Sequence, residues 1–215
     1  MGGNIIPDAE TVKISELSEA LTNFRQALPN LIDYHIIGSA GQKTVSSDVD
    51  VFIDESELLR AFPSNSVKES KVKLKEHFKS LGMTSKLNGV CVHVGIPLEG
   101  KVIQFDIMVI ENAKVISKLH QYDYDHDGMT GGLIQRIRAD LARSHEPSLK
   151  MSPYRGLVNR ETDELITTDL DEMAKILIDD DATKYDLRSV ERLLKTLERH
   201  PEKLEMITEN YLTDA

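Results

Sequence analysis

The chain has 215 residues, of which 40% are hydrophobic and 29% are charged, as in an ordinary soluble globular protein of one domain or two small ones. Its 36 acidic residues outnumber the 26 basic ones, and the net charge of −10 argues against a protein that grips long nucleic acid through a general basic surface. No apolar run approaches the length of a membrane span and the N-terminus lacks a signal-peptide pattern, so we expect a cytoplasmic protein with no membrane partner.

The first part of the chain alternates helical and strand patterns. Apolar residues recur at close to helical spacing until Pro29 ends the pattern. Asp54 is expected to be the N-cap of the next helical segment, and Gly82 ends the basic helix that follows it. The expected elements are a helix over 12–28, strands over 34–37 and 49–53, and helices over 55–62 and 67–81.

Two short motifs lie between the first two strands, in the stretch YHIIGSAGQKTVSSDVDVFID. Successive side chains of a strand alternate faces, so Asp48 and Asp50 project to one side and the apolar residues between and after them to the other. Such a pair of carboxylates repels itself unless a cation compensates, and hard oxygen ligands suit Mg²⁺ or Mn²⁺. Upstream, Gly38 permits close approach of a polyphosphate, next to Ser39. The alternative is that Gly38-Ser39 is an ordinary turn and that Asp48 and Asp50 are an ordinary pair of acidic residues on an edge strand, without a functional role.

A hairpin is predicted from apolar runs over 89–96 and 101–110, which are joined by Pro97-Leu98-Glu99-Gly100. Asp106 stands in the middle of the second run among apolar neighbours, where a buried carboxylate is costly without a partner or a metal. If this strand lies beside 49–53, Asp106 completes a cluster with Asp48 and Asp50. Otherwise Asp106 faces solvent on a half-exposed sheet.

Two further patterns are compatible with metal or thiol chemistry. Cys91 is the only cysteine, which excludes an internal disulfide, and its apolar flanks favour a small buried hydrophobe over a nucleophile. Asp123, Asp125 and Asp127 match the first half of an EF-hand calcium loop, but the twelfth position is Ile134 and not the closing Glu. A solvated connecting loop is therefore the favoured interpretation of that segment.

The C-terminal part is expected to be helical around one hairpin. Thr130-Gly131-Gly132 opens a helix that carries Arg136 and Arg138, and Tyr154-Arg155-Gly156-Leu157 begins a hairpin. Further helices are expected over 168–178, 185–197 and 202–211, with Pro201 as the break between the last two. The helix over 185–197 has an apolar stripe that packs on the rest of the chain or, less favoured, against a second subunit, so the oligomeric state stays open.

Together these motifs resemble the nucleotidyltransferase superfamily typified by DNA polymerase beta. Gly-Ser, Asp-x-Asp and a third Asp on a later strand are its palm motifs, and Ser46-Ser47 resembles the run that precedes the aspartates in family X DNA polymerases. The resemblance implies that Asp48, Asp50 and Asp106 are catalytic and hold the metal. It also implies that the nucleotide is bound by Gly38, Ser39, Lys43, Ser47, Thr130, Gly131, Gly132, Arg136 and Arg138.

The implied fold is α/β (α+β). It has a palm with a mixed sheet flanked by helices over 1–122, a small thumb-like region with a helix and a hairpin over 123–178, and a helical C-terminal extension over 179–215. Two departures stand out. Family X enzymes have an arginine soon after Gly-Ser, where only Lys43 offers charge here, and only 33 residues precede the first expected strand. We therefore expect no counterpart of the N-terminal domains of those polymerases and no templated gap filling.

The resemblance implies an enzyme that uses two Mg²⁺ or Mn²⁺ ions. It would transfer a nucleoside monophosphate from an NTP (such as ATP) or a dNTP to an acceptor hydroxyl without a template. The favoured acceptor is an RNA or DNA end, with a protein or a small molecule as alternatives. A different functional class also remains open, namely a nucleotide-binding regulatory or antitoxin-like protein with the same fold. The size and layout also resemble those of small virus-encoded nucleotidyltransferases.

Overall fold

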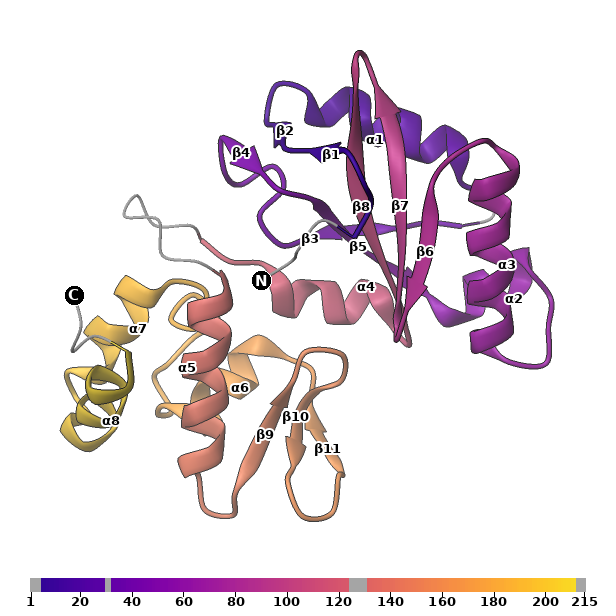
Figure 1. Ribbon diagram of the computed structural model, residues 1–215. Coiled ribbons are helices and arrows are strands. Elements are labelled where there is room, and N and C mark those ends of the chain that lie inside the picture. The colour runs from indigo at the N-terminus through magenta and orange to yellow at the C-terminus, as the bar shows by residue number, and fades with distance from the viewer. Residues whose placement is uncertain (1–4, 30–31, 124–130, 212–215) are drawn as a thin grey trace. The chain divides into compact units, whose positions relative to one another are not determined.

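The computed structural model describes residues 5–29, 32–123 and 131–211, and it divides into two compact units between Ser117 and Lys118 (Figure 1). The three-part division expected from the sequence stays a prediction. Each unit is described on its own below.

The first unit is built on a mixed sheet. Its strands are β1 (Ala9–Glu10), β3 (His35–Ile37), β5 (Val49–Asp54), β6 (Ser85–Asn88), β7 (Cys91–Leu98) and β8 (Lys101–Ile110). They lie in the order β3-β5-β8-β7-β6, and β1 pairs with the start of β8. Strand β8 is parallel to β1 and β5 and antiparallel to β7, so the mixed sheet predicted from the sequence is confirmed.

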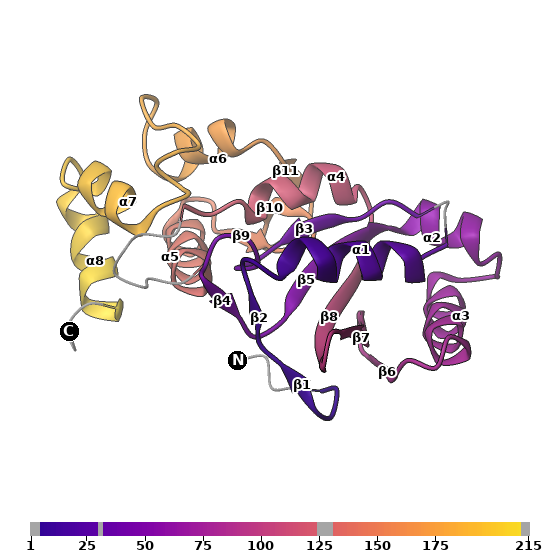
Figure 2. The same cartoon turned by 90° about the horizontal axis from the view of Figure 1, so that it is seen from above.

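Helices flank this sheet as predicted. They are α1 (Leu17–Ala27), α2 (Glu55–Ala61), α3 (Val67–Ser80) and the short α4 (Ala113–Ile116). Helix α1 packs on β7, and α3 packs on β6 and β7, as can be followed in Figures 1 and 2. The Asp54 side chain accepts a hydrogen bond from the backbone N–H of Ser56, so the predicted N-cap of α2 is confirmed.

The hydrophobic core lies between α1, α3 and one face of the sheet. Phe24 of α1 stacks on Phe105 of β8, with ring centroids 4.4 Å apart, and on Phe78 of α3. Val49 and Val51 of β5 are fully buried in the same cluster. Because side chains of a strand alternate, the residues between these apolar ones must point to the opposite face. That opposite face carries the polar groups described in the next section.

Two sequence predictions for this unit are corrected. The first helix begins at Leu17 and not at Val12, because residues 12–13 form β2 (Val12–Lys13), which pairs with β4 (Val45–Ser46). The Lys13 backbone N–H donates to the Glu16 carboxylate, which closes a turn before α1. Strand β6 was not predicted, because its four residues contain only one large apolar side chain.

The second unit contains a small antiparallel sheet and several helices. Its elements are α5 (Gly131–Ser144), β9 (Leu149–Ser152), β10 (Gly156–Asn159), β11 (Leu165–Thr167), α6 (Leu170–Leu177), α7 (Val190–Leu197) and α8 (Pro201–Tyr211), after the 3₁₀ helix η1 (Ser117–His120). The hairpin predicted to begin at Tyr154 is confirmed as β10–β11, and β9 adds a third strand before it. Helix α7 starts later than expected, because Ser189 caps it. Pro201 begins α8 and does not merely separate the two helices, since proline fits the first helical position.

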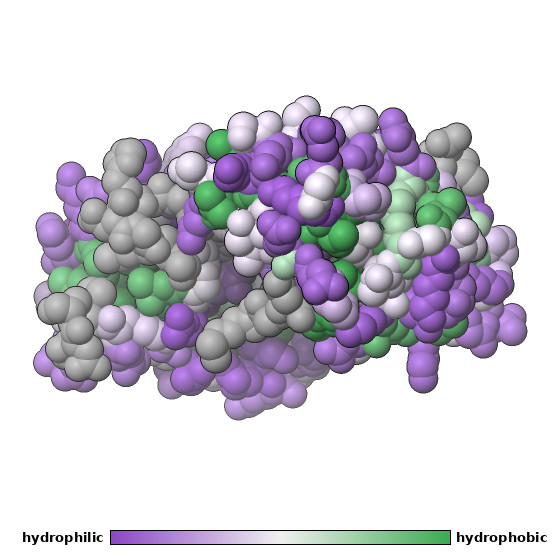
Figure 3. Space-filling model, turned by 45° about the horizontal axis from the view of Figure 1, so that its top comes forward, coloured by the Kyte–Doolittle hydropathy of each residue, from purple (hydrophilic) through white to green (hydrophobic). Residues whose placement is uncertain are grey.

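The apolar stripe of α7 is covered within the chain. Of the five residues of the stripe, Leu187, Val190, Leu193 and Leu197 are each exposed by 3% or less and Leu194 is partly buried, which agrees with packing on the rest of the unit. Within the described ranges, no helix is both long and apolar enough to cross a membrane. Figure 3 shows one face of the molecule, where hydrophilic residues predominate and apolar ones occur in scattered groups.

Candidate active site

The three predicted carboxylates lie on one face of the first unit's sheet. Asp50 is on β5 and pairs in register with Asp106 on the adjacent parallel strand β8. Asp48 comes two residues before Asp50, just ahead of β5, and therefore shares its face. The condition on which the predicted cluster depended, that the strand of Asp106 lies beside that of Asp50, is met.

Two of the three carboxyl groups, those of Asp48 and Asp50, have raised pKa values. Burial, together with the smaller effect of the neighbouring charges of Asp48 and Asp106, raises the pKa of Asp50 to about 7. Burial also raises the pKa of Asp48, with a smaller contribution from Asp106, although a hydrogen bond from the Ser47 hydroxyl opposes the shift. A concentration of negative charge in a partly buried place is what a divalent cation relieves.

The glycine of the Gly-Ser turn is tied to Asp50 by geometry. Gly38 has a φ of +72°, and a Cβ at this position would lie 2.6 Å from Oδ2 of Asp50. A side chain at position 38 would therefore have to displace the carboxylate. The sequence suggested that the missing side chain of Gly38 makes room for a phosphate. The structure shows that it makes room for the carboxylate of Asp50.

The rest of the turn holds the predicted phosphate-binding residues. The carbonyl of Ser39 accepts hydrogen bonds from the backbone N–H groups of Gln42 and Lys43, which folds the segment back on itself. The Ser39 hydroxyl donates to the hydroxyl of Ser46, which is 4% exposed. Ser39 and Lys43 are thus held in one compact loop after β3.

Asp106 is held by two side chains from its own face. Oδ1 of Asp106 lies 2.7 Å from Nδ1 of His93 on β7 and accepts a hydrogen bond of 2.9 Å from Nε2 of Gln104. Gln104 is oriented in turn, because its Oε1 accepts a hydrogen bond from the backbone N–H of Ile6. Oδ2 of Asp106 accepts no hydrogen bond from the described residues. One oxygen is therefore fixed, and the other is available to a cation.

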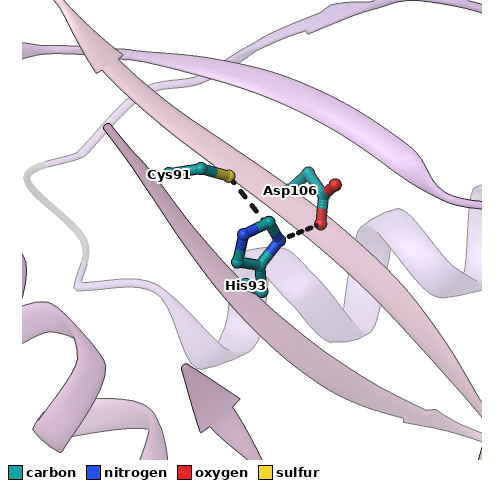
Figure 4. A group of neighbouring side chains, drawn as sticks. All are labelled: Cys91, His93 and Asp106. Atoms are coloured by element: carbon teal, nitrogen blue, oxygen red, sulfur yellow. Dashed lines mark hydrogen bonds and ion pairs between the residues drawn. The ribbon is translucent and has the colours of Figure 1, made fainter. Parts of the chain in front are cut away.

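Cys91 lies beside this group. Its Sγ is 3.7 Å from Nδ1 of His93, and Figure 4 shows Cys91, His93 and Asp106 turned toward one another from β7 and β8. Burial raises the pKa of the Cys91 thiol, and the charges of Asp106 and Asp50 raise it further. The thiol is therefore protonated at neutral pH, which fits the expectation that Cys91 is not a nucleophile. The expectation that it is a buried residue is wrong, because Cys91 is only partly buried.

Sequence reasoning missed His93. The available signal was its spacing of two residues from Cys91 within a strand pattern, which places both side chains on one face. Its contact with Asp106 could not be foreseen, because that contact depends on the register of β7 against β8, in which His93 pairs with Asp106.

Of the nucleotide-binding residues predicted in the second unit, Gly131 and Gly132 form the first turn of α5. Thr130 lies outside the described residues, as do Asp125 and Asp127 of the acidic loop. Asp123, the first acid of that loop, is described, and its carboxylate forms an ion pair of 2.9 Å with Arg188.

The two predicted arginines of α5 have different surroundings. Arg136 is exposed, and its Nε donates to the carbonyl of Gly132. Arg138 is only 2% exposed, and its guanidinium donates to the backbone carbonyls of Leu119 and Leu187. The Arg138 guanidinium is therefore occupied by the protein's own backbone, which leaves Arg136 as the better placed of the two to meet a ligand.

A pocket of about 230 Å³ lies within the second unit. Gly132 and Arg136 line it, together with Tyr122, whose hydroxyl accepts a hydrogen bond of 2.7 Å from the Gln135 side chain. His120 lines it as well and has a lowered pKa, chiefly because it is buried. The pocket thus combines an aromatic ring, an amide and a neutral imidazole.

No protein-family model matches the chain, and no curated protein matches it. Among solved structures, the chain is similar to the Elizabethkingia meningoseptica CdnE cyclic dinucleotide synthase, whose structure was determined with GTP and Apcpp. The match has a TM-score of 0.31 and 14% sequence identity, and it covers 61% of this chain and 52% of that one. The chain therefore spans about half the length of that protein. Because the similarity is weak, function has to be inferred from the side chains of the chain itself.

Proposed function

We propose that this protein is a metal-dependent nucleotidyltransferase, which transfers a nucleoside monophosphate from an NTP or dNTP to an acceptor hydroxyl. The observation that carries the proposal is the pairing of Asp50 with Asp106 on adjacent parallel strands, with Asp48 on the same face. Three carboxylates gathered on a partly buried face are costly for folding unless a ligand compensates them. We infer that the compensating ligand is Mg²⁺ or Mn²⁺, in two ions, because every donor of this set is a hard oxygen.

The metal ions would be held by Asp48, Asp50 and the free oxygen of Asp106. Bound there, they would stabilise the charge of the transferred phosphate and lower the pKa of the acceptor hydroxyl. In the proposed reaction the acceptor oxygen forms a bond to the α-phosphorus. The bond from that phosphorus to the bridging oxygen breaks, and pyrophosphate leaves with the electron pair.

Asp106 is the group that we assign as the acceptor of the hydroxyl proton. His93 and Gln104 are positioning residues, because both contact Oδ1 of Asp106 and hold the carboxylate in place. The loop after β3 is assigned to the phosphates of the nucleotide, with Gly38 and Ser39 at its start and Lys43 at its end. Gly131, Gly132 and Arg136 remain predicted nucleotide contacts.

The proposed acceptor is an RNA or DNA end, extended without a template. The arrangement of the segment from Gly131 to Leu177, a helix followed by a small sheet and a capped helix, supports this choice through its likeness to the thumb of family X polymerases. The net charge of −10 favours contact with an end over a grip on a long duplex.

The chemistry is tested by incubating the full chain with each α-labelled triphosphate, Mg²⁺ or Mn²⁺, and a panel of RNA, DNA and protein acceptors. We expect label transfer that requires the metal and falls on the order of 100-fold or more in Asp106→Asn and in Asp48→Asn/Asp50→Asn. Asp33→Asn is the matched control, because the Asp33 side chain is 78% exposed and forms only a surface ion pair with Arg25. Its activity should equal that of the wild type.

A fully active Asp106→Asn protein would refute the assignment of Asp106. Absence of transfer to every acceptor, combined with metal-dependent thermal stabilisation by a triphosphate, would instead favour a nucleotide-binding protein without catalysis. Absence of both would overturn the proposed function as a whole. Label found on protein only, or in a small product, would replace the nucleic-acid acceptor and leave the chemistry standing.

A further inference from the structure

We propose that Cys91, His93 and Asp106 form a binding site for a thiophilic divalent cation of the Zn²⁺ class, separate from the Mg²⁺ site but sharing Asp106 with it. The thiol sulfur, an imidazole nitrogen and a carboxylate oxygen of these residues all lie within 4.8 Å of one another. Thiolate, imidazole and carboxylate are the three ligand types from which protein zinc sites are built.

The distance between the sulfur and the imidazole nitrogen suits a tetrahedral ion. With bonds of about 2.3 Å to sulfur and about 2.0–2.1 Å to nitrogen and oxygen, tetrahedral ligands lie about 3.6 Å apart for S and N and about 3.4 Å apart for N and O. Sγ of Cys91 is already 3.7 Å from Nδ1 of His93. Nδ1 and Oδ1 of Asp106 are 2.7 Å apart, so their hydrogen bond would have to open by about 0.7 Å to admit the ion. A movement of that size is within reach of side-chain rotation.

The three ligands come from a rigid part of the fold. Cys91 and His93 are two residues apart on β7 and share a face, and His93 pairs in register with Asp106 on β8. His93 and Asp106 have side chains that are only 7% and 14% exposed, whereas Cys91 is half-buried and leaves a path for entry. Three protein ligands leave a fourth tetrahedral position for water.

The site differs in chemistry from the carboxylate cluster beside it. The proposed Mg²⁺ site offers only oxygen, whereas this one offers sulfur and nitrogen, which select Zn²⁺, Co²⁺ and similar ions over Mg²⁺. Binding of Zn²⁺ rests on these three side chains alone and does not depend on the proposed transferase activity.

The test uses the full chain, reduced, metal-free and without a polyhistidine tag, titrated with Co²⁺. A thiolate bound to Co²⁺ absorbs in the near ultraviolet, and because Cys91 is the only cysteine such a band can come from nowhere else in the chain. We expect the band to grow to one equivalent of Co²⁺, to vanish when Zn²⁺ is added, and to be unaffected by excess Mg²⁺. Absence of the band in the wild type would overturn the proposal.

Variants then assign the ligands. Cys91→Ser should abolish the band, and His93→Gln should weaken binding about 100-fold or more, since loss of an outer-shell partner alone costs 10- to 100-fold. The control is His145→Gln, which removes an imidazole that hydrogen-bonds to the carbonyl of Pro147, outside the proposed site, and this variant should bind as the wild type does. Equal Zn²⁺ affinity in Cys91→Ser and wild type would also overturn the proposal.

A measurement on the wild-type chain tests the site even if the variants fail to fold. Bound Zn²⁺ should slow alkylation of Cys91 at least about tenfold, because the metal-bound sulfur is shielded from the reagent. Alkylation at the same rate with and without Zn²⁺ would refute the site. Neither readout involves nucleotides, so an inactive enzyme that still binds Co²⁺ would contradict the proposed function and leave this site intact.

Discussion

Asp50 is the residue whose ionisation is most strongly coupled to the fold. In the unfolded chain its carboxyl has the ordinary pKa of 3.8, whereas in the folded protein burial and the charges of Asp48 and Asp106 raise the pKa to about 7. Between these two values the folded protein keeps a proton that the unfolded chain has lost. In the metal-free protein the contribution of Asp50 to stability therefore falls as pH rises through this window, and it is lost above about pH 7.

We predict that Asp50→Asn removes this pH dependence. The melting temperature of Asp50→Asn minus that of the wild type, both in chelator, should be small near pH 4, should rise up to about pH 7 and should then level off. The full effect corresponds to a few kcal/mol, since each pKa unit is about 1.4 kcal/mol. Thermal unfolding across this range measures it. A difference between the two proteins that does not change with pH would contradict the prediction.

Gly38 provides a second test at the residue scale. Gly38→Ala would place a methyl group 2.6 Å from Oδ2 of Asp50, so the carboxylate must move. We expect the variant to lose stabilisation by Mg²⁺ or Mn²⁺ and most of any transferase activity, as measured by thermal shift and label transfer.

Gly82→Ala is the matched control for Gly38→Ala. Gly82 has nearly the same φ, +79°, but a Cβ there meets nothing within 4 Å. Both variants carry the backbone strain of about 1 kcal/mol, but only Gly38→Ala disturbs the carboxylate. Equal responses of the two variants to metal would show that strain, and not contact with Asp50, explains the effect.

At the scale of elements, Arg138 joins three segments of the second unit. Its guanidinium links α5 to the carbonyl of Leu119 in η1 and to that of Leu187 in the turn before α7. We predict that Arg138→Met lowers the free energy of unfolding by about 3 kcal/mol, because two buried carbonyls lose their donors. The measurement is urea unfolding followed by circular dichroism.

Arg136→Met is the control for this prediction. The Arg136 side chain is exposed and its Nε bonds to a carbonyl within its own helix, so the change in stability should stay within about 0.5 kcal/mol. A similar loss of stability in both variants would mean that α5 is sensitive to the removal of any arginine. The buried hydrogen bonds of Arg138 would then have no special part in stability.

The sequence contained enough to anticipate the strands that carry the carboxylates. Alternation of apolar and acidic residues in 49–53 and 101–110 predicted the shared face, and the apolar face indeed packs on Phe24 and its neighbours. The roles within α5 were less well anticipated. Arg138 stands four residues after Ile134 and three before Leu141, both buried, so helical periodicity placed it on the packed face, where a charged residue was not expected.

Other features could not be predicted, because they depend on contacts between distant segments. The start of α1 is set by the pairing of β2 with β4, whose residues are about thirty positions apart. The His93–Asp106 contact depends on strand register in the same way. Local patterns predict which residues share one face of a sheet, but they do not predict which of these side chains contact one another.

At the scale of the whole molecule, charge limits what the protein can bind. With 26 basic and 36 acidic residues, the chain should repel a long polyanion. We predict that affinity for duplex DNA at physiological salt is weaker than about 10⁻⁴ M, the weak end of nonspecific binding. Fluorescence anisotropy with labelled duplex measures this. Micromolar binding that falls steeply with salt would reveal a local basic surface strong enough to overcome the net charge.

The hydrogen bond between Gln104 and Ile6 has a consequence for the order of folding. It joins residues 98 positions apart, and β1 pairs with β8 across a similar separation. Contacts of such long range form slowly, because a large loop must close before they yield any stabilisation. During synthesis, the N-terminal segment has to wait for β8 to emerge before Gln104 can be oriented toward Asp106. We therefore expect the carboxylate face to be among the last parts of the first unit to reach its final geometry.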